Sequence, residues 1–184
     1  MDRAVVLVEG TSDKAAIEAL AKRHGRDLGA EGVSVVAMGG AQAIDRYLEL
    51  YGPRGANKTL AGLCDAGEVG DFRRGLERAG LGSPVTRGDM ERLAFYVCDP
   101  DLEAELIRAV GPDTVERIAE AQGDIGSFRT LQKQPAWQGR STDEQLRRWM
   151  GSGGSRKVRY PPLLIEALEL SDVPRPLAQL LDHV

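Results

Sequence analysis

Acidic residues stand directly after three of the four short apolar runs in this 184-residue sequence. Glu9 follows AVVLV, Asp65 follows LAGLC, and an acidic group at 99–103 follows LAFYVC. Carboxylates that are brought together repel one another and lose hydration, so a fold that assembles them usually needs a cation. Oxygen ligands of this kind favour Mg²⁺ or Mn²⁺. The pattern therefore suggests Glu9 as a metal ligand.

Each acid also has a plainer explanation. Asp13 lies one turn into the helix expected after Glu9, with Thr11 or Ser12 as its N-cap, and can face the same edge as Glu9 or simply stabilise the helix N-terminus. Glu9 fits a turn residue, and Asp65 fits a cap of the next helix. The coincidence across three strands favours a shared site over three independent explanations.

The elements that must position these residues follow from the hydrophobic pattern. Four apolar runs, each followed by a turn and a helical pattern, predict buried parallel strands at 4–8, 33–37, 60–64 and 93–98. Helices are expected at about 12–24, 41–51 and 68–80, and later near 101–110, 113–122, 142–150 and 161–169. We expect an α/β fold in one domain, 1–184, with a core at 1–110 and a helical C-terminal extension at 111–184. In such a sheet, ligands gather at the carboxyl ends of the strands.

Composition limits the protein class. The hydrophobic content of 42% suits one compact domain, and two cysteines with no leader and no membrane-length apolar run indicate a cytoplasmic protein without a membrane partner. The net charge of -4 argues against a generally basic nucleic-acid coat. Residues 129–159 are the exception, with eight Lys or Arg against two acids.

This basic segment is a candidate phosphate-tracking surface, because Lys and Arg supply most sequence-independent affinity for nucleic acid. Its members are Arg129, Lys133, Arg140, Arg147, Arg148, Arg156 and Arg159. Trp137 and Trp149 could stack bases, but we favour their packing the helical extension onto the sheet while the arginines stay in solvent. The GSGGS stretch at 151–155 is expected to form a flexible loop.

Three motifs of the sequence resemble those of a known family. VVLVEGTSDKAAIEAL, LAGLCDAGE and FYVCDPDLEAEL are similar to the Toprim domain shared by topoisomerases, primases and related nucleases. The resemblance is strongest to the Toprim half of the overcoming-lysogenisation-defect (OLD) nucleases and covers residues 3 to 110 by motif. It implies a Rossmann-like Toprim fold and a metal-dependent endonuclease that hydrolyses nucleic acid, with DNA as the expected type.

The resemblance also implies roles for individual residues. Glu9 matches the glutamate of the first motif, Asp65 the acid of the second, and Asp13 the additional acid of OLD-type sites. The last acidic group would supply further ligands for one or two Mg²⁺ or Mn²⁺ ions, namely Asp99, Asp101 and Glu103. Lys157 resembles the late lysine of these sites and would stabilise charge on the reacting phosphate, although it also fits an ordinary solvated lysine.

The sequence departs from the family in two respects. Many Toprim proteins carry Asp-x-Asp in the second motif, whereas Gly67 stands here at the second acid, which weakens a metal position or shifts it to Glu68. OLD nucleases carry an ATPase domain before Toprim, and this sequence has no Gly-x-x-x-x-Gly-Lys-Ser/Thr phosphate loop. Any ATP dependence would therefore come from a separate ATPase partner.

Two other functions remain open from the sequence. A catalytically weak or inactive Toprim module that binds metal, nucleic acid or a partner ATPase is compatible with Gly67. A phosphoacceptor receiver domain also places an aspartate after its third strand, as Asp65 is placed, but it expects an acid pair after the first. Isolated His24 and His183, and two cysteines without Cys-x-x-Cys spacing, offer no other chemistry.

Overall fold

The chain folds around a parallel β-sheet. The structure, a computed structural model, describes residues 3–184. Its strands are β1 (Ala4–Val8), β2 (Val33–Ala37), β3 (Thr59–Asp65) and β4 (Phe95–Cys98). They lie in the order β2-β1-β3-β4, and every neighbouring pair is parallel. The predicted α/β class is confirmed, and β1 and β2 have the predicted bounds.

Helices cover the sheet and extend beyond it. Those before β4 are α1 (Thr11–Arg23), α2 (Ile44–Tyr51), α3 (Val69–Ala79) and α4 (Arg87–Arg92). Those after β4 are α5 (Leu102–Val110), α6 (Pro112–Ala121), α7 (Ile125–Gln132), α8 (Thr142–Ser152), α9 (Gly154–Ala167) and α10 (Arg175–His183). No helix within residues 3–184 is long and apolar enough to span a membrane.

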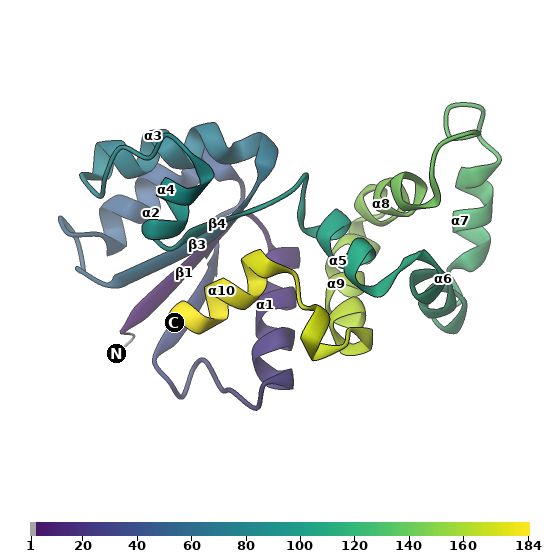
Figure 1. The fold of residues 1–184 in the computed structure, drawn as a ribbon, viewed down its shortest axis with the longest axis horizontal. Coiled ribbons are helices and arrows are strands. Elements are labelled where there is room, and N and C mark those ends of the chain that lie inside the picture. Colours follow the sequence, from purple (N-terminus) through teal and green to yellow (C-terminus); the bar gives the residue numbers. More distant parts are fainter. Residues whose placement is uncertain (1–2) are drawn as a thin grey trace.

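The two faces of the sheet contribute to two apolar cores. Side chains alternate along a strand, so Val5 and Leu7 face one core while Ala4, Val6 and Val8 face the other. Helices α2, α3 and α4 cover the first face, and α1 and α10 cover the second (Figure 1). Both faces of β1 are buried, which explains its continuous apolar run.

The strand order creates a crevice at one place in the sheet. From β1 the chain passes through α1 to β2 on one side, and it later returns to place β3 on the other side of β1. The helices that follow β1 and β3 therefore cover opposite faces, and a crevice opens between the carboxyl ends of these two strands. Glu9 and Asp65 stand at these two ends.

The helices from α5 to α9 lie beyond the carboxyl ends of the strands (Figure 1). Trp149 of α8 is fully buried there between Phe128 and Tyr160, with ring centroids 5.5 and 5.0 Å away. Its indole N–H donates to the hydroxyl of Ser127 at 2.8 Å. The predicted burial of Trp149 is confirmed, although its ring contacts lie within the helical part rather than against the sheet. Trp137 is half-buried against the same core.

The prediction of a flexible loop at 151–155 is wrong. Helix α8 runs to Ser152 and α9 begins at Gly154, so only Gly153 interrupts the helical backbone. Burial of Trp149 and Tyr160 on the two sides of this junction outweighs the low helix propensity of glycine. Helix α9 begins at Gly154, seven residues before the predicted start at Pro161. Proline is typical of the first turn of a helix, but Pro161 lies inside α9.

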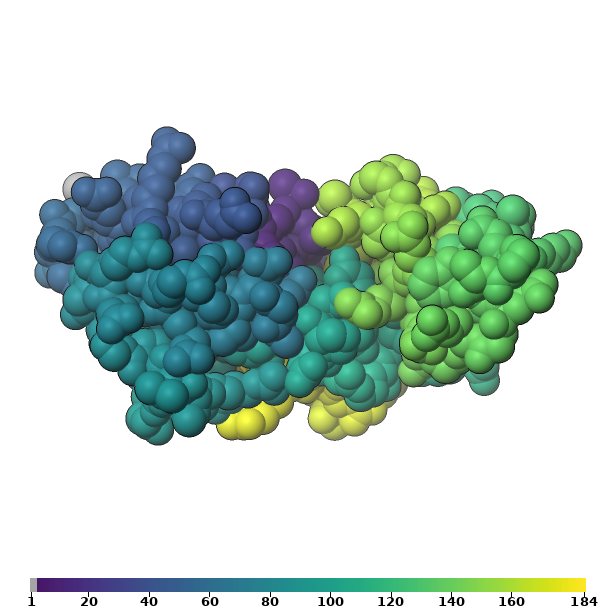
Figure 2. Space-filling view, turned by 90° about the horizontal axis from the view of Figure 1, so that it is seen from above, coloured from purple at the N-terminus to yellow at the C-terminus, as the bar shows by residue number. Residues whose placement is uncertain are grey.

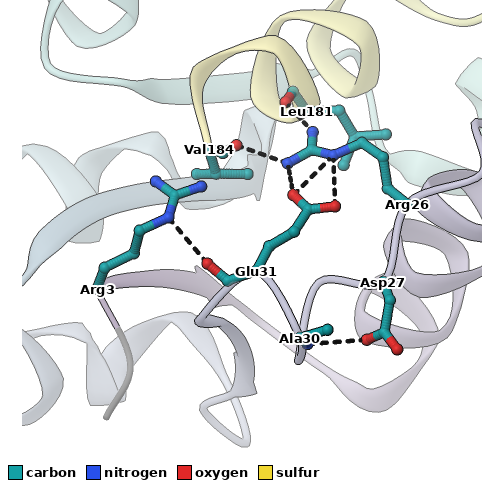
Figure 3. Close-up of polar contacts among 7 residues, drawn as sticks. All are labelled: Arg3, Arg26, Asp27, Ala30, Glu31, Leu181 and Val184. Atoms are coloured by element: carbon teal, nitrogen blue, oxygen red, sulfur yellow. Dashed lines mark hydrogen bonds and ion pairs between the residues drawn. The ribbon is translucent and has the colours of Figure 1, made fainter.

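The last helix returns to the sheet. Helix α10, which the sequence pattern did not predict, packs against β3 and β4. Arg26, in the loop after α1, donates to the carbonyl oxygens of Leu181 and Val184 at 2.6 and 2.7 Å (Figure 3). The same guanidinium pairs with Glu31 at 2.6 Å. Arg26 therefore ties the end of the described chain to the loop before β2.

Candidate metal and nucleic-acid site

Glu9 is held at the crevice by its neighbours on both sides. Its side-chain Oε1 accepts a hydrogen bond from the backbone N–H of Asp65 at 2.9 Å. Its carbonyl oxygen accepts from the N–H groups of Gly39 and Gly40, each at 3.0 Å. These glycines have φ of 82° and 128°, which other residues rarely adopt. The turn after β2 can therefore wrap closely around the end of β1.

Asp13 is directed back toward the start of α1. Gly10, rather than the expected Thr11 or Ser12, is the N-cap, and the Asp13 carboxylate accepts from the Gly10 N–H at 2.8 Å. Ser12 is buried at 4% exposure. Asp13 therefore stabilises the N-terminus of α1, which is the plainer of its two predicted roles. Its carboxylate also lies at the crevice.

Five predicted site residues line one cavity of about 460 Å³. Glu9, Asp13, Asp65, Glu103 and Lys157 come from the ends or first turns of β1, α1, β3, α5 and α9. Glu103 is only 8% exposed, although its position in a first helical turn also suits a solvent-facing acid. We call this cavity the acidic cleft.

The electrostatics of the acidic cleft reflect burial and crowding. The pKa of Asp65 is raised to about 8, chiefly by burial and in addition by the charges of Glu9, Asp13, Asp101 and Glu103. Burial likewise raises the pKa of Glu9, of Asp13 and of Glu103. The ammonium of Lys157 lowers the pKa of these last three groups. A cation in the cleft therefore has four carboxylates to neutralise.

The other two predicted ligands are placed differently. The Asp99 carboxylate is 59% exposed and pairs with Arg87 at 3.0 Å, outside the acidic cleft. Asp101 caps α5, because its Oδ1 accepts from the Ala104 N–H at 2.9 Å. Its Oδ2 accepts from Nε of Arg147 at 2.6 Å. The structure does not bring Asp99 to the cleft, and it leaves Asp101 at the border.

A second pocket of about 440 Å³ adjoins the acidic cleft. Asp65, Glu103 and Lys157 line both cavities. The residues found only in the second pocket are Asp101, Trp137, Arg140, Glu144, Arg147, Arg148 and Gly151. We call it the arginine pocket. Both cavities are lined by residues from the strand ends and from the helical part. The space-filling view shows the sheet part, purple to teal, beside the helical part, mostly green (Figure 2).

The remaining basic residues of the predicted surface make other contacts. Arg129 pairs with Glu116 at 2.5 Å, and Arg159 pairs with Asp124. Arg156 lies over the ring of Trp149 at 4.8 Å and donates to Ser127. Lys133, the residue that follows α7, is exposed. Of the seven basic residues of the predicted surface, three line the arginine pocket, namely Arg140, Arg147 and Arg148.

Some lining residues were not singled out from the sequence. Glu144 closes the capping box of α8 and also lines the arginine pocket. Val158, 40% exposed, lines the acidic cleft beside Lys157. The sequence indicates a place in the site for Val158 only through its position next to Lys157. An apolar side chain by itself does not point to a metal or phosphate site.

The donor chemistry of the acidic cleft fits a hard divalent cation. Its carboxylate oxygens are the ligands that Mg²⁺ and Mn²⁺ prefer, and their mutual repulsion is the electrostatic reason for a cation. Within residues 3–184, no three His, Cys, Asp or Glu side chains are arranged closely enough to hold an ion as they stand. Glu9, Asp13 and Asp65 each accept a hydrogen bond from a backbone N–H. Ion binding would exchange some of these bonds.

Comparison with known proteins agrees with the architecture. Residues 2–65 match the family of overcoming lysogenization defect protein-like Toprim domains. No curated protein matches the chain. The C-terminal region of the Xanthomonas campestris pv. campestris OLD protein is 21% identical, with a TM-score of 0.77, over 100% of this chain and 92% of that one. The corresponding region from Burkholderia pseudomallei is also 21% identical, with a TM-score of 0.75, over 100% and 97%.

These findings bear on different lengths of the chain. The sequence match covers the part that contains Glu9, Asp13 and Asp65, whereas the structural likeness extends through α10 and shows the fold alone. Residues 2–65 are therefore similar in sequence to OLD-like Toprim domains, and the fold of the whole chain is similar to that of the C-terminal regions of OLD proteins.

Proposed function

We propose that this chain is a divalent-metal-dependent nuclease of the OLD-like Toprim type that hydrolyses phosphodiester bonds in nucleic acid, with DNA as the expected substrate. The observation that carries the proposal is the meeting of four carboxylates and Lys157 in one cleft beside a pocket with three arginines. Acids alone would suit a cation and arginines alone would suit an anion. Their adjacency suits a phosphate that reacts next to bound metal.

Each group in the acidic cleft has a proposed role. Glu9, Asp13, Asp65 and Glu103 would hold one or two Mg²⁺ or Mn²⁺ ions, with Asp101 at the border. The bound cation supplies activation of water and stabilisation of the leaving oxygen in such reactions. Lys157 would place its ammonium near the non-bridging oxygens of the reacting phosphate, where negative charge develops. The positive charge of Lys157 already acts on Glu9, Asp13 and Glu103, whose pKa values it lowers.

The arginine pocket would orient the substrate. Arg140, Arg147 and Arg148 present guanidinium groups that can bind phosphate oxygens in pairs. Arginine-phosphate contacts position a strand without reading its sequence. Because Asp65, Glu103 and Lys157 line both cavities, a strand bound by the arginines can extend its next phosphate into the acidic cleft.

A non-cleaving role is the second candidate, and Gly67 favours it. A Cβ at this position would meet nothing within 4 Å, so the backbone has room for a side chain where the second motif lacks its acid. A metal site with one ligand fewer could bind nucleic acid, or a partner ATPase, without hydrolysis. In that case metal and strand would bind in the same two cavities.

Supercoiled plasmid incubated with purified protein and Mg²⁺, Mn²⁺ or EDTA tests the proposal. We expect nicking or linearisation with metal only, and loss of at least about 100-fold in rate for Glu9→Gln and Asp65→Asn, which keep size but remove charge. Glu49→Gln, on the exposed side of α2, is the matched control and should cut as the unaltered protein does. Binding of Mn²⁺ and DNA without cutting by any preparation would support the non-cleaving module instead.

A further inference from the structure

One ion pair connects the acidic cleft with the arginine pocket. Arg147 of α8 donates from Nε to Oδ2 of Asp101 at 2.6 Å, across 46 residues of sequence. The Asp101 side chain is 16% exposed and that of Arg147 is 46% exposed. The other carboxylate oxygen of Asp101 caps α5. The pair therefore joins the N-cap of α5, the helix that carries Glu103, to α8, which carries Arg147 and Arg148.

The position of this pair sets the charges on each side of it. Asp101 lines the arginine pocket together with Asp65 and Glu103, both of which also line the acidic cleft. Its charge acts on Asp13 as well, whose pKa it raises. Arg147 neutralises Asp101, and it lies among Arg140 and Arg148. Separation of the pair would add one negative charge next to the cleft and one positive charge to the pocket.

We propose that Arg147 exchanges Asp101 for a backbone phosphate of a nucleic-acid strand, and that this exchange couples strand binding in the arginine pocket to cation binding in the acidic cleft. The inference rests on the proposed function and adds a mechanism for coupling substrate to metal. Asp101 is then a positioning residue that occupies Arg147 while no strand is bound.

The direction of the coupling follows from charge. A phosphate can accept two parallel N–H bonds from a guanidinium, and it carries the same charge as the carboxylate it replaces. The released Asp101 carboxylate stands beside four other acids, where it is unfavourable unless a cation binds. Strand binding should therefore strengthen cation binding. By linkage the cation must strengthen strand binding by the same factor.

The Asp101–Arg147 ion pair can separate at little cost in free energy. Arg147 is about half exposed, so a strand can reach it, and partly exposed ion pairs contribute little to stability. The Oδ1 bond to Ala104 does not involve Arg147, so α5 can keep its cap while Oδ2 changes partner. The exchange needs no movement of a helix.

Measured Mn²⁺ affinity, with and without a short phosphorothioate-linked DNA oligonucleotide that resists cleavage, tests the inference. Free Mn²⁺ can be followed by its paramagnetic resonance signal. We expect the oligonucleotide to tighten Mn²⁺ binding by roughly 5- to 150-fold, the usual range of such coupling. In Arg147→Met, Mn²⁺ should bind more tightly than to the unaltered protein without oligonucleotide, and the oligonucleotide should add less than about twofold.

Two further variants separate exchange from a general loss of charge. Arg148→Met removes an arginine of the same pocket and should weaken oligonucleotide binding while the oligonucleotide still tightens Mn²⁺ binding. Asp101→Asn can keep the cap of α5 and frees Arg147, so its affinity for the oligonucleotide in EDTA should rise severalfold. Circular dichroism and thermal unfolding confirm that each variant is folded before its affinities are compared.

Several results would overturn the inference. An unchanged Mn²⁺ affinity at saturating oligonucleotide, or identical behaviour of Arg147→Met and Arg148→Met, would remove the coupling through this pair. Tightening of the same size by millimolar inorganic phosphate would remove the assignment to a strand. Metal-dependent cutting with uncoupled binding would overturn only this inference, whereas coupled binding without cutting would overturn only the nuclease proposal.

Discussion

The side chain of Glu9 accepts the backbone N–H of Asp65 at 2.9 Å, which joins the carboxyl ends of β1 and β3 at the crevice of the sheet. The bond directs the Glu9 carboxylate toward the residue whose own carboxyl has a pKa raised to about 8. The carboxyl groups of Glu9 and Asp65 therefore affect the stability of the fold, and they are also the groups proposed to hold the metal.

We expect the metal-free protein to lose stability as the pH rises. The folded pKa of Asp65, about 8, lies above its ordinary value of 3.8, so the folded state binds more protons than the unfolded state between these values. The unfolding free energy should fall from about pH 4 to about pH 8. Asp65→Asn should be more stable than the unaltered protein at pH 8 in EDTA by at least about 1.4 kcal/mol, the value of one pKa unit.

Thermal unfolding at several pH values in EDTA measures this effect. For a chain of this size, 1 kcal/mol corresponds to a shift of about 2–4 °C in Tm. Asp113→Asn, an exposed acid on α6, is the control and should leave the pH dependence unchanged. A Tm of Asp65→Asn at or below that of the unaltered protein at pH 8 would contradict the expectation.

Lys157 should affect metal affinity and reaction rate in opposite directions. Lys157→Met removes a positive charge that lowers the pKa of Glu9, Asp13 and Glu103, so Mn²⁺ should bind severalfold more tightly. Loss of charge stabilisation on the reacting phosphate should lower the single-turnover cleavage rate by about 100- to 1,000-fold. Lys22→Met, near the far end of α1, should change neither quantity. Weaker Mn²⁺ binding by Lys157→Met would contradict the repulsion expected between the Lys157 ammonium and the bound ion.

Gly67→Asp should strengthen metal binding. A Cβ at this position meets nothing within 4 Å, and Gly67 does not have a positive φ, so a side chain fits without strain. The new acid lies two residues after Asp65, and we expect a gain of about 10-fold in Mn²⁺ affinity, equivalent to about 1.4 kcal/mol. Gly126→Asp adds the same charge on α7, also without a clash, and is the control. Equal Mn²⁺ affinities of the two variants would refute a local effect.

Trp149→Ala should destabilise the helical part strongly. The indole is 1% exposed, packs against Phe128 and Tyr160, and donates to Ser127, so its removal leaves a large cavity. A loss of about 3–5 kcal/mol in unfolding free energy is expected from urea denaturation. Trp137→Ala, at a half-buried position, should cost clearly less. Similar losses for both would show that burial does not distinguish the two residues.

Arg26→Met should loosen α10 without unfolding the sheet. The variant keeps most of the aliphatic stem but loses the bonds to Leu181 and Val184 and the pair with Glu31 (Figure 3). Hydrogen exchange of α10 amides should become at least about 10-fold faster, because each lost bond contributes about 1 kcal/mol. Exchange in β1 should not change. Equal acceleration in β1 would indicate global destabilisation rather than release of the helix.

The periodicity of the sequence determined the sheet and the first part of the site. Continuous apolar runs specify buried parallel strands, and right-handed crossovers leave few ways to connect them, so the acids after β1 and β3 had to approach one another. The same reasoning was less successful after β4. Helices α7 and α10 were not predicted, and α8 and α9 nearly meet where glycines suggested a loop.

Only the tertiary structure decided which charged residues share a cavity. Asp99 and Asp101 are two residues apart, yet one faces Arg87 in solvent and the other pairs with Arg147 beside the acidic cleft. Among the basic residues, Arg140, Arg147 and Arg148 reach the arginine pocket, whereas Arg129 and Arg159 pair with acids on neighbouring helices. The direction of a long charged side chain depends on partners far away in sequence, and local patterns carry no information about those partners.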